Sequence, residues 1–412
     1  MEVWSCHDEA NVREAVAWAA AEKSPLRILG AGTTRDIGRP VEAARLLDLS
    51  KLAGITLYEP NELVLRARAG TRMAEIEAQI AAKDQCFFFE PRDLGPLFGA
   101  PAGGATLGGI VSTNLAGPRR FKAGAVRDHV LGFTGINGRA EVFKSGGRVM
   151  KNVTGYDFSK LVTGAFGTLS VLTEITVKVM PRAETACTLA LAGLDDGAAI
   201  QVLKDALALP HDITGAAHLP AAVARRSKVG EVAMLKEGVT LLRVEGEAAV
   251  VDARLKALGQ RFRRPGFFIG PLAERGGALV LEGKASELLW REIRDVSYFV
   301  DWPGPVWRVS TAPTNGPSVA ASVGARAWFY DWAGGLVWLL VDDTPHADDA
   351  LVRRAVLNAG GHATLIRASD AQRKTLDVFE PQPPPLAALT KRVKASFDPL
   401  GILNPGLMYP DV

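Results

Sequence analysis

The feature that most constrains the fold is a dense run of glycines between Gly99 and Gly138, where ten of forty residues are glycine. Glycine is entropically costly in regular helices and strands, so a segment rich in it needs positive-φ turns or close approach to a ligand. These glycines alternate with Leu, Ile and Val, which argues against a disordered linker. The run therefore predicts loops that bind a large nucleotide cofactor, with a tightly turned structural core as the alternative.

With 412 residues, the chain exceeds the usual size of a single hydrophobic core, so at least two domains are expected. A net charge of +3 argues against general nucleic-acid binding. The three cysteines, Cys6, Cys86 and Cys187, form no CxxC pair, so no metal site is expected. No signal peptide or transmembrane segment is predicted. The expected location is cytoplasmic, and peripheral attachment to the inner membrane through partners stays open.

Helical and strand-like patterns mix along the chain and predict an α+β fold. Residues 11–22 have the spacing of an amphipathic helix, and residues 166–179 carry the β-branched side chains typical of buried strands. A helix is predicted at 386–397, followed by a turn-rich tail that should pack against an earlier part of the chain. We expect three parts, at 1–182, 183–385 and 386–412.

The first glycine loop follows a predicted strand and begins with Gly30, Ala31 and Gly32. This start is typical of a dinucleotide-binding turn, but the third glycine of that pattern is replaced by Arg35. What remains is a turn whose backbone N–H groups, with the hydroxyls of Thr33 and Thr34, can bind a pyrophosphate. A plain turn between two strands is the alternative.

The second loop lies inside the glycine-rich run and offers both side-chain donors and close backbone approach. The hydrogen-bonding side chains are Thr106, Ser112, Thr113 and Asn114, and the glycines that permit close approach are Gly108, Gly109 and Gly117. Four cations follow that could balance a diphosphate, namely Arg119, Arg120, Lys122 and Arg127. For these cations an ordinary solvated face is the alternative.

Six different short motifs follow one another along the chain, at 30–34, 48–52, 68–71, 105–109, 149–157 and 164–169. In this order they resemble the FAD-binding domain of the vanillyl-alcohol oxidase and p-cresol methylhydroxylase (PCMH) family. The segments 115–120, 306–310, 358–364 and 397–406 are similar, more narrowly, to the FAD-binding subunits of bacterial glycolate oxidases. The similarity extends over nearly the whole chain.

The resemblance implies a two-subdomain PCMH-type FAD-binding domain, an α+β cap domain and a C-terminal tail that returns to the flavin domain. It implies FAD held without a covalent bond, because no His, Cys or Tyr lies between Arg27 and Arg39. Together with the loop arguments it gives the expected cofactor-binding set: Gly30, Ala31, Gly32, Thr33, Thr34, Thr106, Gly108, Gly109, Ser112, Gly117, Arg127, Asn152, Gly167, Ile175 and Asn404.

The resemblance further implies a subunit of a glycolate oxidase complex that oxidises glycolate, a small 2-hydroxy acid, to glyoxylate. Its expected partners are a catalytic flavin subunit and an iron–sulfur subunit, which would receive electrons through the flavin. The chain lacks the Gly-Glu-His-Gly run of the catalytic subunit, which argues against independent turnover. Two alternatives stay open: a self-sufficient FAD-dependent 2-hydroxy-acid dehydrogenase, and an assembly subunit whose FAD is structural.

Oxidation of a 2-hydroxy acid needs a cation for the carboxylate and a base for the hydroxyl proton. Arg308 is the candidate carboxylate clamp, with a structural arginine packed on a tryptophan as the alternative. His362 is the candidate base, and an ordinary histidine in a turn or in the core is the alternative. The resemblance places Tyr156 near the flavin, and a core aromatic is its alternative. Six of the eight tryptophans lie between Trp290 and Trp338, in either a partner interface or the core.

Overall fold

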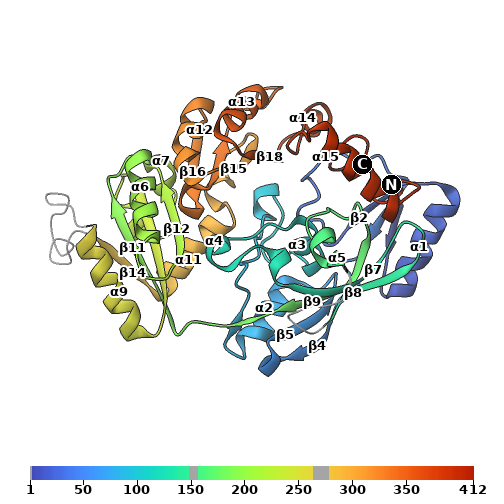
Figure 1. Ribbon diagram of the computed structural model, residues 1–412, viewed down its shortest axis with the longest axis horizontal. Helices are drawn as coiled ribbons and strands as arrows, with labels where there is room; N and C mark the ends of the chain where they lie inside the picture. The colour runs from blue at the N-terminus through green and yellow to red at the C-terminus, as the bar shows by residue number, and fades with distance from the viewer. Residues whose placement is uncertain (1, 148–155, 263–277) are drawn as a thin grey trace. The chain divides into compact units, whose positions relative to one another are not determined.

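The structure is a computed structural model that describes residues 2–147, 156–262 and 278–412 (Figure 1). The chain divides into two compact units. Unit 1 comprises residues 1–117, 123–182 and 373–412, and unit 2 comprises residues 118–122 and 183–372. Residues 373–385, which the sequence analysis grouped with the second domain, therefore fall in unit 1.

The first part of unit 1 is a small parallel sheet. Strand β3 (Arg45–Asp48) lies between β1 (Glu2–Ser5) and β2 (Leu26–Leu29). Helix α1 (Glu9–Glu22) begins at the N-cap Asp8, whose carboxylate accepts the Asn11 N–H. Its buried residues are the predicted ones, Val12, Ala15, Val16 and Ala19. This hydrophobic face closes a core with Leu26 and Leu47, which fixes β2 at the entrance of the first glycine loop.

The second part of unit 1 is a five-stranded antiparallel sheet in the order β4-β5-β9-β7-β8. Its strands are β4 (Ile55–Glu59), β5 (Val64–Arg68), β9 (Val171–Lys178), β7 (Val130–Ile136) and β8 (Val142–Gly146). The predicted strand at 166–179 is thus realised as β9, and the residues before it form a turn. Helices α2 (Met73–Ala81), α3 (Leu107–Thr113) and α5 (Phe158–Val162) accompany the sheet, and β6 (Gln85–Cys86) pairs with β10 (Met180–Pro181).

The C-terminal tail of unit 1 packs against strand β2 of the first sheet. After α15 (Pro384–Phe397), Leu403 forms a parallel bridge with Leu26, whose N–H donates to the carbonyl of Ile402 at 2.8 Å. The buried ammonium of Lys394 fixes this arrangement, because it donates to the carbonyls of Thr168 and Leu403 and to Asp398. The two ends of the chain therefore build one wall of unit 1 together.

Unit 2 is built on an eight-stranded antiparallel sheet in the order β14-β11-β13-β12-β16-β17-β15-β18. The strands are β11 (Thr185–Ala192), β12 (Ile213–Leu219), β13 (Val239–Gly246), β14 (Leu279–Glu282), β15 (Val306–Ser310), β16 (Ala327–Asp331), β17 (Leu336–Leu340) and β18 (His362–Arg367). The helices are α6 (Asp196–Leu207), α7 (Ala221–Ala224), α8 (Gly230–Ala233), α9 (Ala248–Arg261), α11 (Gly283–Arg294), α12 (Gly316–Val323) and α13 (Asp349–Ala359). The short helices α4 (Arg120–Ala123) and α14 (Asp370–Thr375) lie where the chain passes between the units.

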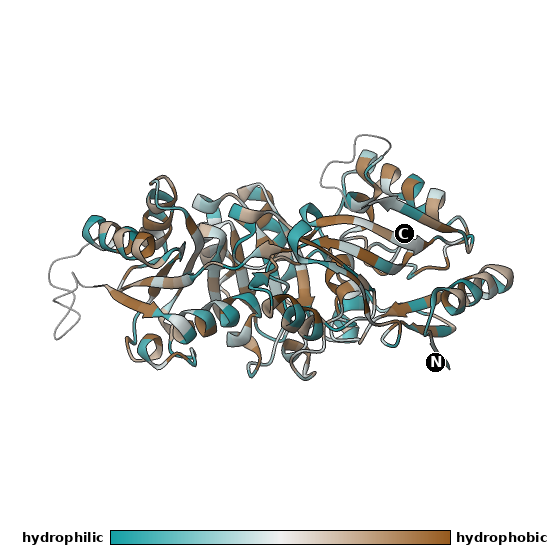
Figure 2. Cartoon of the chain, turned by 90° about the horizontal axis from the view of Figure 1, so that it is seen from below, coloured by the Kyte–Doolittle hydropathy of each residue, from teal (hydrophilic) through white to brown (hydrophobic). Residues whose placement is uncertain are grey.

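Most of the clustered tryptophans fill the interior of unit 2. Four of the six are buried, namely Trp290, Trp307, Trp332 and Trp338. The core interpretation is therefore correct for these four. The helices carry hydrophilic and hydrophobic residues side by side, as helices that cover a sheet must, whereas many strands are largely hydrophobic (Figure 2). Among the described residues, none of the helices combines the length and apolar character that crossing a membrane requires.

Candidate functional site

The first glycine loop leaves strand β2 and packs directly onto the second. A Cβ atom at Gly30 would lie 2.3 Å from the hydroxyl oxygen of Thr106, so only glycine fits at this point of contact. Two turn hydrogen bonds shape the rest of the loop, from the Arg35 N–H to the Gly32 carbonyl and from the Ile37 N–H to the Thr34 carbonyl. The loop is therefore a compact turn held against the start of α3.

The second glycine segment begins helix α3. Thr106 is its N-cap, and the Thr106 hydroxyl accepts the Gly109 N–H at 3.3 Å. The Gly108 N–H donates to the carbonyl of Ala69 at 2.7 Å, which ties the helix to the end of β5. The Thr113 hydroxyl donates to the Gly109 carbonyl at 2.9 Å, so this side chain is used within the helix. The helix start is thereby fixed opposite the first loop.

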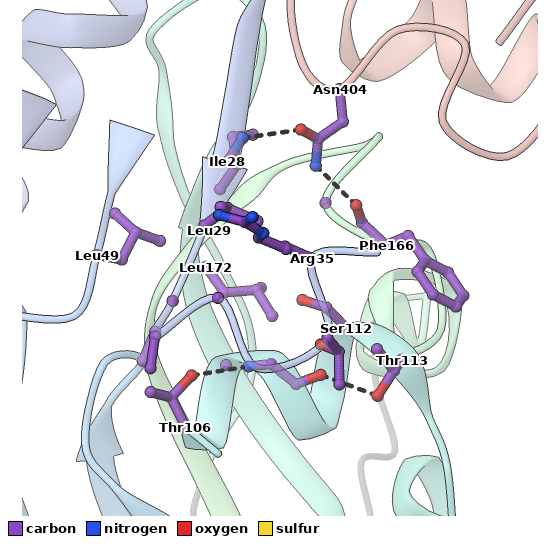
Figure 3. A pocket seen from close by; sticks show the side chains of 18 of the residues that line it. Ile28, Leu29, Arg35, Leu49, Thr106, Ser112, Thr113, Phe166, Leu172 and Asn404 are labelled. Carbon is purple, nitrogen blue, oxygen red and sulfur yellow. Dashed lines mark hydrogen bonds between the residues drawn. The ribbon is translucent and has the colours of Figure 1, made fainter. Parts of the chain in front are cut away.

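The two glycine segments line one pocket within unit 1 (Figure 3). Of the predicted cofactor residues, the lining contains Gly30, Ala31, Gly32, Thr33, Thr34, Thr106, Gly108, Gly109, Ser112, Gly167 and Asn404. Leu49, Leu172 and Ile28 supply apolar surface beside these polar groups. A polar turn next to an apolar wall suits a ligand that carries both a charged group and a flat ring.

Asn404 holds the far wall of this pocket together. Its side-chain oxygen accepts the Ile28 N–H at 2.8 Å, and its amide nitrogen donates to the Phe166 carbonyl at 2.8 Å (Figure 3). The Phe166 N–H in turn donates to the Ser112 carbonyl at 2.9 Å. Phe166 and Gly167 both have left-handed backbone, with φ of 51° and 71°. Asn404 therefore positions the turn before β9 against β2, and the side chain is already engaged in internal hydrogen bonds.

Two buried polar atoms in the pocket lining have no hydrogen-bond partner among the residues that the structure describes. They are Nη1 of Arg27 and the hydroxyl oxygen of Ser170. Burial, followed by the charge of Arg373, lowers the pKa of Arg27 to about 10, and Asp36 opposes this shift. Arg27 is still a cation at neutral pH. Buried polar groups are usually paired, so two unpaired donors in one pocket lining suit a ligand with acceptor groups, such as a phosphate-bearing cofactor.

The remaining predicted cofactor residues lie elsewhere in unit 1 or outside the described residues. Ile175 is fully buried in the core of the five-stranded sheet. The Gly117 N–H donates to the Phe89 carbonyl at 2.9 Å. The Arg127 side chain is half exposed and lies 4.0 Å from Asp128. None of these three belongs to the lining of the pocket described above, and Asn152 lies outside the described residues.

The three predicted catalytic residues lie in different places. Arg308, in β15, is 7% exposed, and its guanidinium lies 5.1 Å from the ring centroid of Trp332. His362 is the exposed first residue of β18 and pairs in register with Ser310. Tyr156 belongs to unit 1, is 83% exposed, and has its ring 6.0 Å from that of Phe158. Arg308 thus makes the kind of tryptophan contact that the structural alternative describes, and Tyr156 is not a core aromatic.

Comparison with known proteins decides the family. The family described as FAD binding domain matches residues 2–146, which include both glycine segments. The chain is 33% identical over 408 residues to glycolate oxidase subunit GlcE of Escherichia coli, covering 99% of both proteins. This chain belongs to the GlcE family. It carries an FAD-binding domain, and the pocket of unit 1 lies in that domain and its C-terminal extension.

Other relatives of this GlcE-family chain match less of it. An uncharacterized FAD-linked oxidoreductase of Mycobacterium tuberculosis is 25% identical, with 95% of this chain and 87% of that protein covered. A D-lactate dehydrogenase of Anaerostipes hadrus is 33% identical over 35% of this chain and 28% of its own length. Among solved structures, p-cresol methylhydroxylase has a TM-score of 0.70 at 15% identity, with 99% of this chain and 88% of that chain covered. The last likeness shows that the fold is PCMH-type.

Sequence reasoning did not identify Arg27 or Phe166 as pocket residues. The resemblance placed the strand around residues 167–175 along FAD, but Ser170 and Leu172 were not named as single residues. A signal for Arg27 was present, because it is a charged residue in an otherwise apolar strand three positions before the glycine loop. Ser170 and Leu172 have no such signal, since they follow a turn at the start of an ordinary buried strand. Their place in the pocket depends on how β9 lies beside α3.

Proposed function

We propose that this chain is the FAD-binding subunit of a glycolate oxidase complex, which oxidises glycolate to glyoxylate and passes the electrons through its flavin to partner subunits. The observation that carries the proposal is the match to E. coli GlcE over 99% of both chains, combined with the pocket formed by the two glycine segments. An end-to-end match includes unit 2 and the tail, which a shared FAD-binding domain alone does not explain.

In this proposal, unit 1 binds the cofactor. FAD supplies an acceptor for the two electrons that leave the alcohol carbon. The backbone N–H groups of residues 30–34 bind its diphosphate, and Thr106 holds α3 against that loop. Asn404 keeps the Phe166 turn and β2 at a fixed separation, so the pocket keeps its shape before the cofactor binds. Such preorganisation reduces the conformational cost of binding.

For the substrate we propose Arg308 as the group that binds the carboxylate and His362 as the base that takes the hydroxyl proton. An arginine binds a carboxylate through two parallel hydrogen bonds, and a histidine titrates near neutral pH. The contact with Trp332 also restricts the guanidinium to one plane, a geometry that carboxylate binding through two parallel hydrogen bonds can use. We further propose Tyr156 as a substrate contact, for which its exposed hydroxyl is the support.

The test is an anaerobic titration of the purified chain with glycolate and with D-lactate, followed by the flavin absorbance near 450 nm. We expect the flavin to stay oxidised with the chain alone and to bleach once the partner subunits are present. Bleaching by the chain alone would instead establish a self-sufficient dehydrogenase, a reading favoured by partial matches to D-lactate dehydrogenases. If the flavin is never reduced in the assembled complex, the chain is an assembly subunit whose FAD is structural.

The expected partners are a catalytic flavin subunit and an iron–sulfur subunit. Support for a partner comes from the name of the E. coli relative, which is one subunit of glycolate oxidase. We also propose a cytoplasmic location. All three cysteines are free, as in most proteins of a reducing compartment. Co-purification of the tagged chain with both subunits from cytosolic extract tests the two statements together.

A further inference from the structure

One short segment of the glycine-rich run belongs to unit 2, although the rest of the run belongs to unit 1. This segment comprises residues 118–122. Two ion pairs hold it in unit 2, between Arg119 and Glu245 and between Lys122 and Asp212. Arg120 lies between the two anchored residues, so its backbone is fixed in unit 2 from both sides.

The side chain of Arg120 stacks on Trp332, whose ring also contacts the guanidinium of Arg308. The two guanidinium carbons lie 4.8 and 5.1 Å from the centroid of this ring. Arg308 and Trp332 are 7% and 8% exposed and Arg120 is half-buried, so water screens the two charges only weakly. Even with the carboxylate of the adjacent Asp331, these groups together carry a net positive charge, which favours an anion.

The turn that carries Trp332 has a backbone that its sequence does not favour. Trp332 and Ala333 follow one another in the left-handed region, with φ of 52° and 55°, in the hairpin loop between β16 and β17. Loops with two such residues prefer Asn-Gly, and a bulky side chain is unusual there. The fully buried Asp331 accepts the Trp332 N–H at 2.8 Å and holds the turn. Such strain is common at functional sites, and here it fixes the ring on which both cations stack.

The sheet face that carries Arg308 also carries His362. Arg308 and Ser310 are two residues apart in β15, and side chains at this spacing lie on the same face of a sheet. Ser310 pairs in register with His362 of β18, and directly paired residues also share a face. The groups proposed to bind the carboxylate and to take the hydroxyl proton therefore lie on one face, which suits a ligand whose two polar groups are on adjacent carbons.

We propose that Arg120 is a second substrate-binding cation, which donates to the hydroxyl oxygen of a 2-hydroxy acid while Arg308 binds the carboxylate. The inference rests on the proposed function in taking Arg308 as the carboxylate-binding group. A cation at the hydroxyl oxygen stabilises the negative charge that grows there as His362 takes the proton. Two cations also make the site prefer small ligands with two adjacent acceptor groups over simple carboxylates.

The test measures how two unreactive anions bind to the full-length chain loaded with FAD, by isothermal titration calorimetry. Acetate has one carboxylate and needs one cation, whereas oxalate has two adjacent carboxylates and can use both. For Arg120→Met we expect about thirtyfold weaker oxalate binding, the loss typical of a hydrogen bond to a charged group, and acetate binding within about twofold of the parent. For Arg308→Met we expect both anions to bind at least about tenfold more weakly. Arg120→Lys keeps the charge and should recover part of the oxalate affinity.

Two controls separate this site from general effects of charge and of stacking. Lys122→Met removes a positive charge from the same segment and should leave both anion affinities unchanged. Arg226→Met removes a guanidinium that lies 4.3 Å from the ring centroid of Trp302, another tryptophan of unit 2, and should also leave them unchanged. In the assembled complex, Arg120→Met should lower kcat with glycolate by about a hundredfold, because the charge on the hydroxyl oxygen develops only in the transition state.

The proposal is overturned if Arg120→Met weakens oxalate and acetate by the same factor, or weakens neither. It is equally overturned if Lys122→Met lowers the oxalate affinity as much as Arg120→Met does, or if Arg120→Met leaves kcat unchanged. Failure of the proposed function is a different result, in which the two anions bind with the expected pattern but glycolate never reduces the flavin in the assembled complex.

Discussion

Two polar regions of the molecule differ in how fully they are paired, namely the carboxylate networks of unit 2 around Glu292 and Asp196 and the pocket wall of unit 1. In these unit 2 networks, the carboxylates have their partners inside the chain. Glu292, 3% exposed, accepts the Ser227 hydroxyl at 2.7 Å and the Lys228 N–H at 2.6 Å. Asp196 accepts Trp328 and Tyr330 at 2.7 and 2.6 Å. In the pocket of unit 1, by contrast, Arg27 and Ser170 each keep one atom unpaired within the described residues.

Whether buried polar atoms have partners within the chain helps to distinguish a structural network from the lining of a binding pocket. A satisfied network is complete without a ligand, so its residues contribute to stability. An unpaired donor that also lines a pocket can gain its partner from a ligand, so such a residue contributes to affinity. We therefore expect variants of unit 2 networks to change the free energy of unfolding, and variants of the pocket to change FAD affinity.

The largest effect is expected for Lys394→Met in unit 1, because the buried Lys394 ammonium has all its hydrogen-bond partners inside the chain. The ammonium donates to two carbonyls and to the fully buried Asp398, so its loss leaves a buried carboxylate without its cation. We expect a loss of about 3–5 kcal/mol in the free energy of unfolding, measured by urea denaturation. Saturating FAD should not restore it fully.

The matched control is Lys391→Met on the same helix. Lys391 pairs with Asp411 at 2.8 Å, but both side chains are more than half exposed, so little change is expected. Equal effects of the two substitutions would show that the buried Lys394–Asp398 pair has no special role in holding the tail.

A smaller effect is expected for Glu245→Gln in unit 2. Burial disfavours its ionised form, but the charges of Arg243 and Arg119 outweigh burial and lower the pKa to about 2. The resulting stabilisation, about 3 kcal/mol, is fully present above the ordinary glutamate pKa near 4.5 and is lost as the pH falls towards 2. Urea unfolding at pH 7, 5, 4 and 3 should show the gap between variant and parent closing only below about pH 4.5. A gap that is independent of pH contradicts the ion-pair explanation.

For the pocket, Gly30→Ala should weaken FAD binding by about tenfold or more. The new Cβ would lie 2.3 Å from the Thr106 hydroxyl oxygen, and relieving such overpacking typically costs about 1–3 kcal/mol by moving the loop away from α3. The measurement is FAD titration by fluorescence. As control, Gly259→Ala lies inside helix α9, where nothing within 4 Å obstructs a Cβ, and should leave FAD affinity unchanged while raising stability slightly.

The smallest effect on FAD affinity is expected for Asn404→Ala, because the residue acts on the cofactor through others. Its loss leaves the Ile28 N–H and the Phe166 carbonyl without their partner and should cost about 2 kcal/mol of stability. FAD affinity should fall severalfold as the wall loosens. Asn315→Ala, which removes a comparable bond to the Ala359 carbonyl in unit 2, should lower stability without touching FAD affinity. If both variants weaken FAD binding equally, Asn404 has no specific role in the pocket wall.

Much of the candidate site could be predicted because its chemistry lies in short local patterns. Residues 30–34 and Thr106 to Gly109 are turn and cap residues, and their spacing reveals their backbone conformation before any tertiary contact is known. The tail was likewise predictable, since its fixed turns at 398–406 have no purpose in a free end. Arg127 and Gly117 were assigned to the cofactor by residue type and by their place in and after the second loop, and neither lines the pocket. Residue type alone does not tell whether a side chain or a backbone segment faces the pocket.

What the sequence determined by itself is the presence of an FAD-binding domain, the α+β class and the two loops that meet in the pocket, because local backbone chemistry and the order of motifs carry that information. Only the tertiary structure decided which side chains complete the pocket. Asn404 is 376 residues from Ile28. Arg27 lines the pocket from β2, and Ser170 lines it from the position directly before β9. Whether such a donor is paired depends on every neighbour that folding brings to it, and no local pattern records that.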